Sequence, residues 1–441
     1  MRIGVDGYTL DISQGTGLAA YTRTLQSALS LLGLQTTVVY GRNVTVPASG
    51  RSKIPADVAL FDVAPQSRLV RLKERLPKGV SPLLSRRSIL PDDVAISNVV
   101  DTRLLDLRED VRFLNVRDLY RRAYNHFSLY KRPLTLDLPS DVGLMHWTHP
   151  FPIAAGNVPN VYTIHDLIPL RLPYTTADRV EYYYSLMQYV TATADILVTV
   201  SWTTYRDLIS LFPQAAEKTV VTYEALPTIQ NMDALWTSDE EVNEVLAGEY
   251  GLSRGDYFLF VGAIEPKKNV ERLLEAYLAS GTKRPLLMVG SNGWYSEAVL
   301  GELESLWRRG RRDYVGPGRV VRLNYVSSRR LDTLIRGARA LLFPSVYEGF
   351  GLPIIEGMSR GTPVMTSNNG ATAEIAGDAA ALVDPYSVKD IARAIRRLDG
   401  DEELMKTLSE RGSARADYFS LARYSARLRT AYERVGRPLF T

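Results

Sequence analysis

The stretch FPSVYEGFGLPIIE, residues 343–356, decides the fold class of this 441-residue chain. An apolar run, Ala340–Phe343, predicts a strand that leads through a loop into a helix beginning near Leu352. Such a junction directs backbone N–H groups and the positive end of the helix dipole toward one point, which suits a phosphate or diphosphate. Gly349 and Gly351 allow the backbone to approach such a ligand closely. The stretch therefore predicts an α/β fold with an anion site at the carboxyl end of a strand.

Two carboxylates belong to the same stretch, Glu348 on the loop and Glu356 about one turn into the helix. Carboxylates beside an anion are unfavourable unless they accept hydrogen bonds from hydroxyls, and sugars carry hydroxyls next to phosphates. The combination predicts a nucleotide-sugar site. The alternative interpretation is a surface loop followed by an acidic helix start.

The spacing of Glu348 and Glu356 resembles the Glu-x7-Glu signature of the retaining family-4 glycosyltransferases. Four further segments are similar to that family in order and spacing: FVGAIEPKKN (260–269), GTPV (361–364), EIAGDA (374–379) and LVDP (382–385). In the N-terminal half the similarity is thinner and rests on three short segments: GTG (15–17), TIHDL (163–167) and TVS (199–201). Members of this family transfer a sugar from a nucleotide donor with retention of anomeric configuration.

Short apolar runs alternate with amphipathic helical patterns, which is typical of parallel sheets. The predicted strands are 2–5, 36–40, 142–147, 161–164, 195–200 and 219–223, then 257–261, 286–289, 320–323, 340–343, 364–366 and 381–383. Residues 18–32 have the apolar period of a helix, whereas 43–140 break the pattern and predict long loops with a helix near 117–130.

The resemblance implies two Rossmann-like domains that face each other across a cleft, the arrangement called GT-B. We expect an acceptor-side domain over 1–230 and a nucleotide-sugar-binding domain over 250–417, joined by a linker near 225–253. A last helix near 421–435 should cross back, so that about 418–441 belongs to the first domain. Ligands of such sheets bind at the carboxyl ends of the strands.

The resemblance also implies catalytic roles. Lys267 and Lys268 match the basic pair at the donor diphosphate, although many members have Arg where this chain has Ala263, and Arg is commoner at position 267. His165 and Asp166 match a motif that touches the donor sugar and borders the acceptor. Glu348 is expected beside the transferred sugar.

Glu356 should accept hydrogen bonds from the ribose hydroxyls of the donor. The other residues that the resemblance assigns to the donor are Gly15, Thr16, Gly17, Ser201, Gly262, Tyr325, Val326, Gly349, Phe350, Gly351 and Leu352. Tyr325 and Val326 would hold the base, while 349–352 would offer backbone N–H groups to the sugar and phosphates.

Two pairs of residues resemble metal-ligand patterns, but neither predicts a metal site. His146 and His149 lie in a strand-to-loop stretch, where they would not share a face, so packing or acceptor contact is the better interpretation. Asp399 and Asp401 join two helices and fit a turn with an N-cap. We therefore expect no metal and no cofactor.

Composition is that of a soluble globular protein long enough for two domains. The absence of cysteine excludes disulfides, cysteine-ligated zinc and thiol nucleophiles, and agrees with a reducing cytoplasm. No apolar run approaches 18 residues, and the N-terminus resembles an opening strand rather than a signal peptide. We expect a cytoplasmic enzyme.

Basic charge is concentrated in one region. Residues 51–132 hold 17 Lys and Arg against 10 Asp and Glu, a net charge of +7, which leaves −3 for the rest of the +4 chain. The densest part, 68–87, interleaves basic and apolar residues, which favours peripheral contact with an anionic membrane surface. A solvated insertion is the alternative, and no nucleic-acid-binding module is present to suggest nucleic acid.

Within the family, the sequence is similar to bacterial mannosyltransferase-like members that build surface polysaccharide such as O-antigen. The resemblance thus implies transfer of a hexose, mannose from GDP-mannose, to a glycan acceptor linked to a polyprenyl diphosphate, with UDP- and dTDP-sugars as the alternative donors. The alternatives are a nucleotide-sugar epimerase, which shares the two-domain architecture, and a non-catalytic nucleotide-sugar-binding protein.

Overall fold

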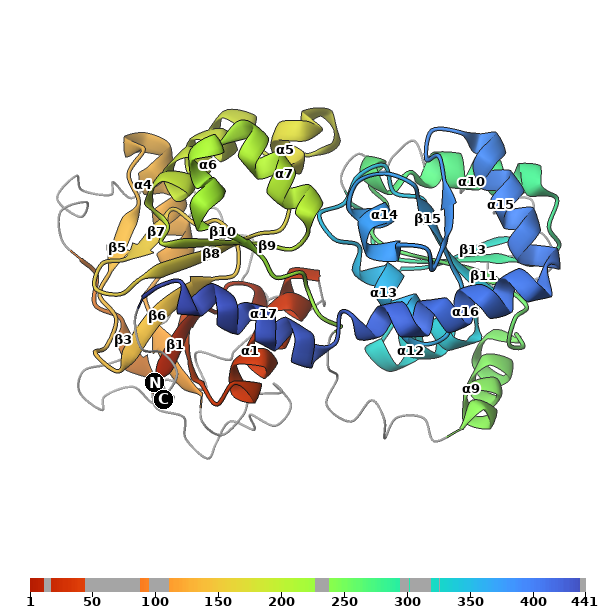
Figure 1. Ribbon diagram of the computed structural model, residues 1–441, viewed down its shortest axis with the longest axis horizontal. Coiled ribbons are helices and arrows are strands. Elements are labelled where there is room, and N and C mark those ends of the chain that lie inside the picture. Colours follow the sequence, from red (N-terminus) through yellow and green to blue (C-terminus); the bar gives the residue numbers. More distant parts are fainter. Residues whose placement is uncertain are drawn as a thin grey trace.

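Two lobes, each a mainly parallel sheet flanked by helices, lie side by side along the long axis of the molecule (Figure 1). The computed structural model describes residues 1–11, 17–43, 88–94, 111–226, 238–293, 301, 319–324 and 326–436. The basic stretch 68–87 lies outside the described residues. The predicted α/β architecture with two Rossmann-like domains is confirmed.

The first sheet has the order β10-β9-β8-β6-β1-β2-β4-β3, in which only the pair β3–β4 is antiparallel. Its strands are β1 (Arg2–Asp6), β2 (Gln35–Tyr40), β3 (Asp92–Val94), β4 (Arg112–Asn115), β6 (Val142–Trp147), β8 (Asn160–Ile164), β9 (Ile196–Thr199) and β10 (Thr219–Val221). The direction of strand order reverses between β1 and β6, which pair in register at Val5 and His146. The loops after these two strands therefore leave a crevice between them.

The helices of this lobe are α1 (Gly17–Leu31), α4 (Leu119–Tyr130), α5 (Ile168–Arg171), α6 (Val180–Thr193) and α7 (Trp202–Leu211). A separate two-stranded sheet pairs β5 (Leu134–Leu136) with β7 (Ile153–Ala155). The sequence predicted neither this small sheet nor β3 and β4, because such short strands carry little periodic signal.

The second sheet is wholly parallel and has the order β13-β12-β11-β14-β15-β16. Its strands are β11 (Phe258–Val261), β12 (Leu286–Val289), β13 (Val320–Leu323), β14 (Ala340–Phe343), β15 (Val364–Ser367) and β16 (Ala381–Val383). The switch in strand order lies between β11 and β14. Both β12 and β14 are buried along their whole length, which explains why they are continuous apolar runs.

The helices of the second lobe are α9 (Asp239–Val245), α10 (Val270–Ser280), α12 (Ser328–Gly337), α13 (Leu352–Ser359), α14 (Gly370–Ala376), α15 (Val388–Gly400) and α16 (Glu402–Asp417). Helix α9 packs against α12, so the second domain begins within the predicted linker. The acidic residues there form the first turn of α9, and the hydroxyl of Ser238 caps it.

The last helix, α17 (Leu421–Glu433), leaves the second lobe and lies along α1 of the first (Figure 1). Tyr424, Leu428 and Tyr432 on α17 are buried in one cluster with Tyr21 and Leu25 of α1. The predicted return of the chain is thus confirmed, and its apolar face completes the first core.

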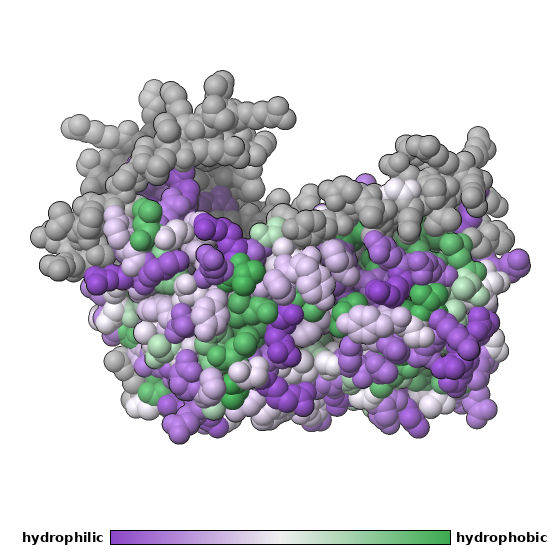
Figure 2. Space-filling view, turned by 90° about the horizontal axis from the view of Figure 1, so that it is seen from above, coloured by the Kyte–Doolittle hydropathy of each residue, from purple (hydrophilic) through white to green (hydrophobic). Residues whose placement is uncertain are grey.

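The surface seen in Figure 2 is largely polar, with apolar side chains scattered among charged ones. Among the helices that the structure describes, none has the length and apolar character needed to cross a bilayer.

We expect Tyr432→Phe to lower the free energy of unfolding by about 1–3 kcal/mol, because the hydroxyl of Tyr432 bonds the buried ring of His146 at 2.6 Å. The midpoint of urea denaturation measures this loss. Tyr386→Phe, at a tyrosine that is 58% exposed, should leave the midpoint unchanged. Equal midpoints for Tyr432→Phe and the unmodified protein would contradict the assignment.

Candidate active site

A cavity of about 1740 Å³ lies between the two lobes, at the carboxyl ends of both sheets. It brings together most of the residues that the sequence predicted. Those that line it are Gly17, His165, Asp166, Gly262, Lys267, Lys268, Val326, Glu348, Gly349, Phe350, Gly351, Leu352 and Glu356.

Four predicted residues are not part of this lining. Gly15, Thr16 and Tyr325 lie outside the described residues. Ser201 is fully buried behind the cavity wall, where its hydroxyl donates to the carbonyl of Gly349 at 2.7 Å and caps α7. The structure therefore places Ser201 as a support of the loop, and not at the cavity surface.

Lys268 and Glu348 form an ion pair, with 2.6 Å between Nζ and Oε1, and both side chains are largely buried. Burial raises the pKa of Glu348, but the charges of Lys268 and Lys267 outweigh burial and lower the pKa below its ordinary value. Lys267 lies 3.6 Å from Glu265, and its pKa is raised because Glu348, Asp166 and Glu265 outweigh burial. Lys267 is thus charged at neutral pH.

Glu356 lines the cavity from the second turn of α13. Burial raises the pKa of its carboxyl group, an effect that the charge of Arg360 partly offsets. Within the described part of the chain, the carboxylate of Glu356 has no hydrogen-bond partner, whereas Asp332 binds both Arg336 and Arg360. Glu356 therefore presents acceptor oxygens to the cavity.

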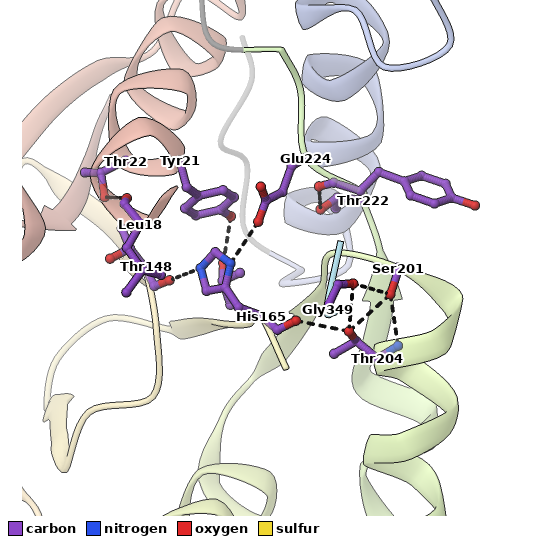
Figure 3. A network of polar contacts seen from close by, with 12 residues as sticks. Leu18, Tyr21, Thr22, Thr148, His165, Ser201, Thr204, Thr222, Glu224 and Gly349 are labelled. Atoms are coloured by element: carbon purple, nitrogen blue, oxygen red, sulfur yellow. Dashed lines mark hydrogen bonds and ion pairs between the residues drawn. The ribbon is translucent and has the colours of Figure 1, made fainter. Parts of the chain in front are cut away.

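The loop before α13 contains two positions that favour glycine, Gly349 and Gly351. Gly351 has a left-handed φ of 104° immediately before the helix. A Cβ at Gly349 would overlap the carbonyl oxygen of His165 on the first domain. The two domains therefore touch backbone to backbone at this point, and Thr204 bonds both carbonyls, at 3.1 Å to His165 and 3.2 Å to Gly349 (Figure 3).

The ring of His165 is held by two acceptors. Nε2 donates to the carbonyl of Thr148 and Nδ1 to the carboxylate of Glu224, both at 2.9 Å (Figure 3). Burial lowers the pKa of His165, but Glu224 and the Thr148 carbonyl outweigh burial and raise the pKa overall. Because both ring nitrogens face acceptors, the geometry favours the imidazolium form of His165, which has no lone pair with which to accept a proton.

Sequence reasoning missed Glu224, which follows β10 and is 5% exposed. Its signal was a carboxylate directly after a predicted strand, but nothing local pointed to His165 as its partner.

The C-terminal helix reaches the same network. Tyr21 contacts the ring of His165 edge-on at 4.7 Å and bonds Thr163 at 2.7 Å, while Tyr424 on α17 bonds Tyr21 at 3.2 Å. His146 bonds Thr163 and Tyr432, so the structure gives it a packing role.

A second missed residue joins the domains. Glu374 on α14 accepts hydrogen bonds from the backbone N–H groups of Trp202 and Thr203 at 2.8 and 2.9 Å, and so caps α7 of the opposite domain. Tyr347 also bonds Asp207 on α7. Helix α7 thus carries much of the contact between the lobes.

The family described as "Glycosyl transferases group 1" matches residues 246–415. "O-antigen chain mannosyltransferase B" of Escherichia coli is 34% identical over 278 residues, which cover 62% of this chain and 70% of the relative. "Serotype-specific mannosyltransferase WbdA" of the same species is 26% identical, over 61% of this chain but only 33% of the much longer relative.

Solved structures show the same fold. A sucrose-phosphate synthase from Thermosynechococcus elongatus superposes with a TM-score of 0.64 at 17% identity, over 99% of both chains. The predicted family resemblance is confirmed: this chain belongs to the group 1 glycosyltransferases.

Proposed function

We propose that this protein is a retaining mannosyltransferase that transfers mannose from GDP-mannose to a glycan acceptor and needs no metal ion. The observation that carries the proposal is the grouping of Lys267, Lys268, Glu348 and Glu356 at the switch point of the second sheet, where nucleotides bind in such folds. Relatives named as O-antigen mannosyltransferases support mannose as the sugar.

Lys267 and Lys268 bind the donor diphosphate, and the N-terminus of α13 adds its dipole to theirs. These charges take the part that a metal plays in other sugar transferases. Glu356 accepts hydrogen bonds from the ribose hydroxyls, and Val326, with Tyr325, borders the base. Glu348, already oriented by Lys268, lies beside the transferred sugar and stabilises positive charge at its anomeric carbon.

The bond from the anomeric carbon to the diphosphate breaks as the acceptor oxygen attacks from the same face. The proton of the acceptor hydroxyl passes to the leaving diphosphate oxygen, so configuration is retained without an enzymic nucleophile. His165 is a positive group at the sugar rather than a base, because both of its ring nitrogens are donors. Asp166, which follows it, also lines the cavity, and its charge contributes to the raised pKa of Lys267.

The acceptor is a lipid-linked glycan of bacterial surface polysaccharide such as O-antigen, carried on a polyprenyl diphosphate. The basic stretch 68–87 supports this part of the proposal, because it would hold a cytoplasmic protein at the anionic inner face of the membrane.

With GDP-mannose and octyl α-D-mannopyranoside as the acceptor, we expect release of GDP and a product whose anomeric signal in NMR is α. EDTA should leave the rate unchanged, and UDP-glucose should react more slowly. Conversion of GDP-mannose without acceptor would indicate an epimerase instead. No GDP release above background with any mannoside would contradict the proposed function.

Lys268→Ala should lower kcat about tenfold to a hundredfold, because a charge-assisted interaction with the diphosphate contributes about 1.5–3 kcal/mol. Lys406→Ala is the matched control, since that side chain is 78% exposed, pairs only loosely with Glu410 at 4.0 Å and does not line the cavity. Steady-state kinetics of GDP release measure both variants. An unchanged kcat in Lys268→Ala would remove the assignment of this lysine to the diphosphate.

Glu224→Gln should lower the pKa of His165 from above its ordinary value of 6.5 to below it, because burial then acts without the opposing carboxylate. The raised pKa stabilises the folded protein below pH 6.5, and that stabilisation is lost as the pH rises through the folded-state pKa. The stability difference between the two proteins should therefore be larger at pH 6 than at pH 9.

NMR titration of the His165 ring measures the pKa, and the chain has only 4 histidines to resolve. The same titration midpoint in both proteins would contradict the imidazolium assignment.

A further inference from the structure

The first-domain side of the cavity is lined by rings that the proposed donor chemistry does not use. We call Tyr8, Tyr120, His149 and Phe151 the aromatic wall; all four line the cavity. Tyr8 follows β1, while His149 and Phe151 follow β6, so the wall stands at the switch point of the first sheet. It lines the same cavity as the lysines and glutamates that lie at the switch point of the second sheet.

Tyr8 is supported from several sides and still exposed. Its ring makes edge-on contacts with Tyr120, Phe151 and His149, with centroids 4.9, 5.3 and 5.7 Å apart. Even so, 42% of Tyr8 remains exposed, and its hydroxyl bonds no residue that the structure describes. A large ring held rigidly at a cavity surface loses little side-chain entropy when a ligand packs on it.

His149 adds a hydrogen-bond acceptor to this surface. Its Nδ1 lies 3.2 Å from the carbonyl of Pro150, which can only accept, so Nδ1 carries the proton. Burial and the positive charge on His165 lower the pKa of His149 to about 3, which keeps the ring neutral. Nε2 therefore has a lone pair, and within the described part of the chain it has no partner.

Phe151 fixes the orientation of that imidazole. The two ring centroids are 3.9 Å apart with an angle of 38° between the planes. Phe151 is itself 5% exposed, so it acts as a buried backing for the His149 ring.

We propose that the aromatic wall is the subsite for the terminal pyranose of the acceptor glycan, with the sugar face packed on Tyr8 and one sugar hydroxyl donating to Nε2 of His149. This rests on the proposed function. A pyranose presents C–H bonds of weak positive potential on its faces and hydroxyls at its edge, and an aromatic face is negative. The exposed ring of Tyr8 suits the C–H face of the sugar, and the neutral imidazole of His149 can accept a hydrogen bond from a sugar hydroxyl.

The proposed hydrogen bond from a sugar hydroxyl to Nε2 also defines the role of His149. A ring with so low a pKa cannot hold the proton of the acceptor hydroxyl, so His149 is a positioning residue, and the leaving diphosphate takes the proton.

Three variants test the subsite: Tyr8→Ala removes the packing surface, His149→Leu removes the acceptor atom, and His149→Gln keeps an acceptor oxygen near the position of Nε2. Tyr184→Ala is the matched control, because Tyr184 is also 42% exposed but packs on Phe212 outside the cavity. GDP affinity by calorimetry reports on folding and on the donor half of the site. Saturation-transfer NMR and GDP-release kinetics with octyl α-D-mannopyranoside report on the acceptor half.

We expect Tyr8→Ala and His149→Leu to raise the KM for the mannoside about tenfold and to weaken its saturation-transfer signal, with GDP affinity unchanged. His149→Gln should recover most of the loss, and Tyr184→Ala should behave as the unmodified protein. An unchanged mannoside KM in both Tyr8→Ala and His149→Leu would overturn the subsite, as would weakened GDP binding with an unchanged mannoside signal.

The same measurements distinguish failure of the acceptor subsite from failure of the proposed mannosyltransferase activity. A mannoside that binds to the unmodified protein and is lost in Tyr8→Ala supports the subsite even if no mannose is transferred, which would count against the proposed function alone. No mannoside signal in the unmodified protein, with GDP bound, would overturn the subsite.

Discussion

The contact between Gly349 and the carbonyl of His165 is the constraint on which the site depends. A side chain at position 349 would overlap that carbonyl. The loop after β14 can therefore approach the loop after β8 only because residue 349 is glycine. The hydroxyls of Ser201 and Thr204, at the start of α7, donate hydrogen bonds to the Gly349 carbonyl. In the other direction, Glu374 of the second domain accepts hydrogen bonds from backbone N–H groups of α7. The residues on either side of this contact, Glu348 and the His165 ring, are placed by it.

Each side of the contact buries a charged pair. Lys268 with Glu348 and His165 with Glu224 are taken largely out of water, and the attraction within each pair must offset that desolvation. Such pairs contribute less to stability than apolar packing would, but they hold charge in one orientation. A site that stabilises developing charge benefits from groups that need not reorganise during the reaction.

The two walls of the cavity divide the chemistry between them. The second domain offers lysines, glutamates and a helix N-terminus, which suit a nucleotide diphosphate and its sugars. The first domain offers supported aromatic rings and a neutral imidazole, which suit an uncharged sugar ring. Helix α17 and Tyr21 connect the back of the first wall to the network around His165, so the returning helix is part of the site's support.

The fold class and the second-domain wall were determined by the sequence alone. β12 and β14 are buried on both faces and are therefore continuous apolar runs, and both match their predicted bounds, as do the less buried β13 and β16. Glu348, Gly349, Gly351 and Glu356 lie within one strand-to-loop-to-helix segment whose chemistry indicated an anion and sugar site, whereas Lys267, Lys268 and Val326 were expected from the resemblance to the family. The small sheet β5–β7 and strands β3 and β4 were too short to carry such a signal.

Which charges pair was decided only by the tertiary structure. Lys268 and Glu348 are 80 residues apart, His165 and Glu224 are 59 apart, and Ser201 and Gly349 are 148 apart. These partners meet because strand order brings particular loop ends to the two switch points, and apolar periodicity does not encode strand order. The aromatic wall is assembled from β1, β6 and α4 for the same reason, since a ring's neighbours across a crevice are set by topology and not by local sequence.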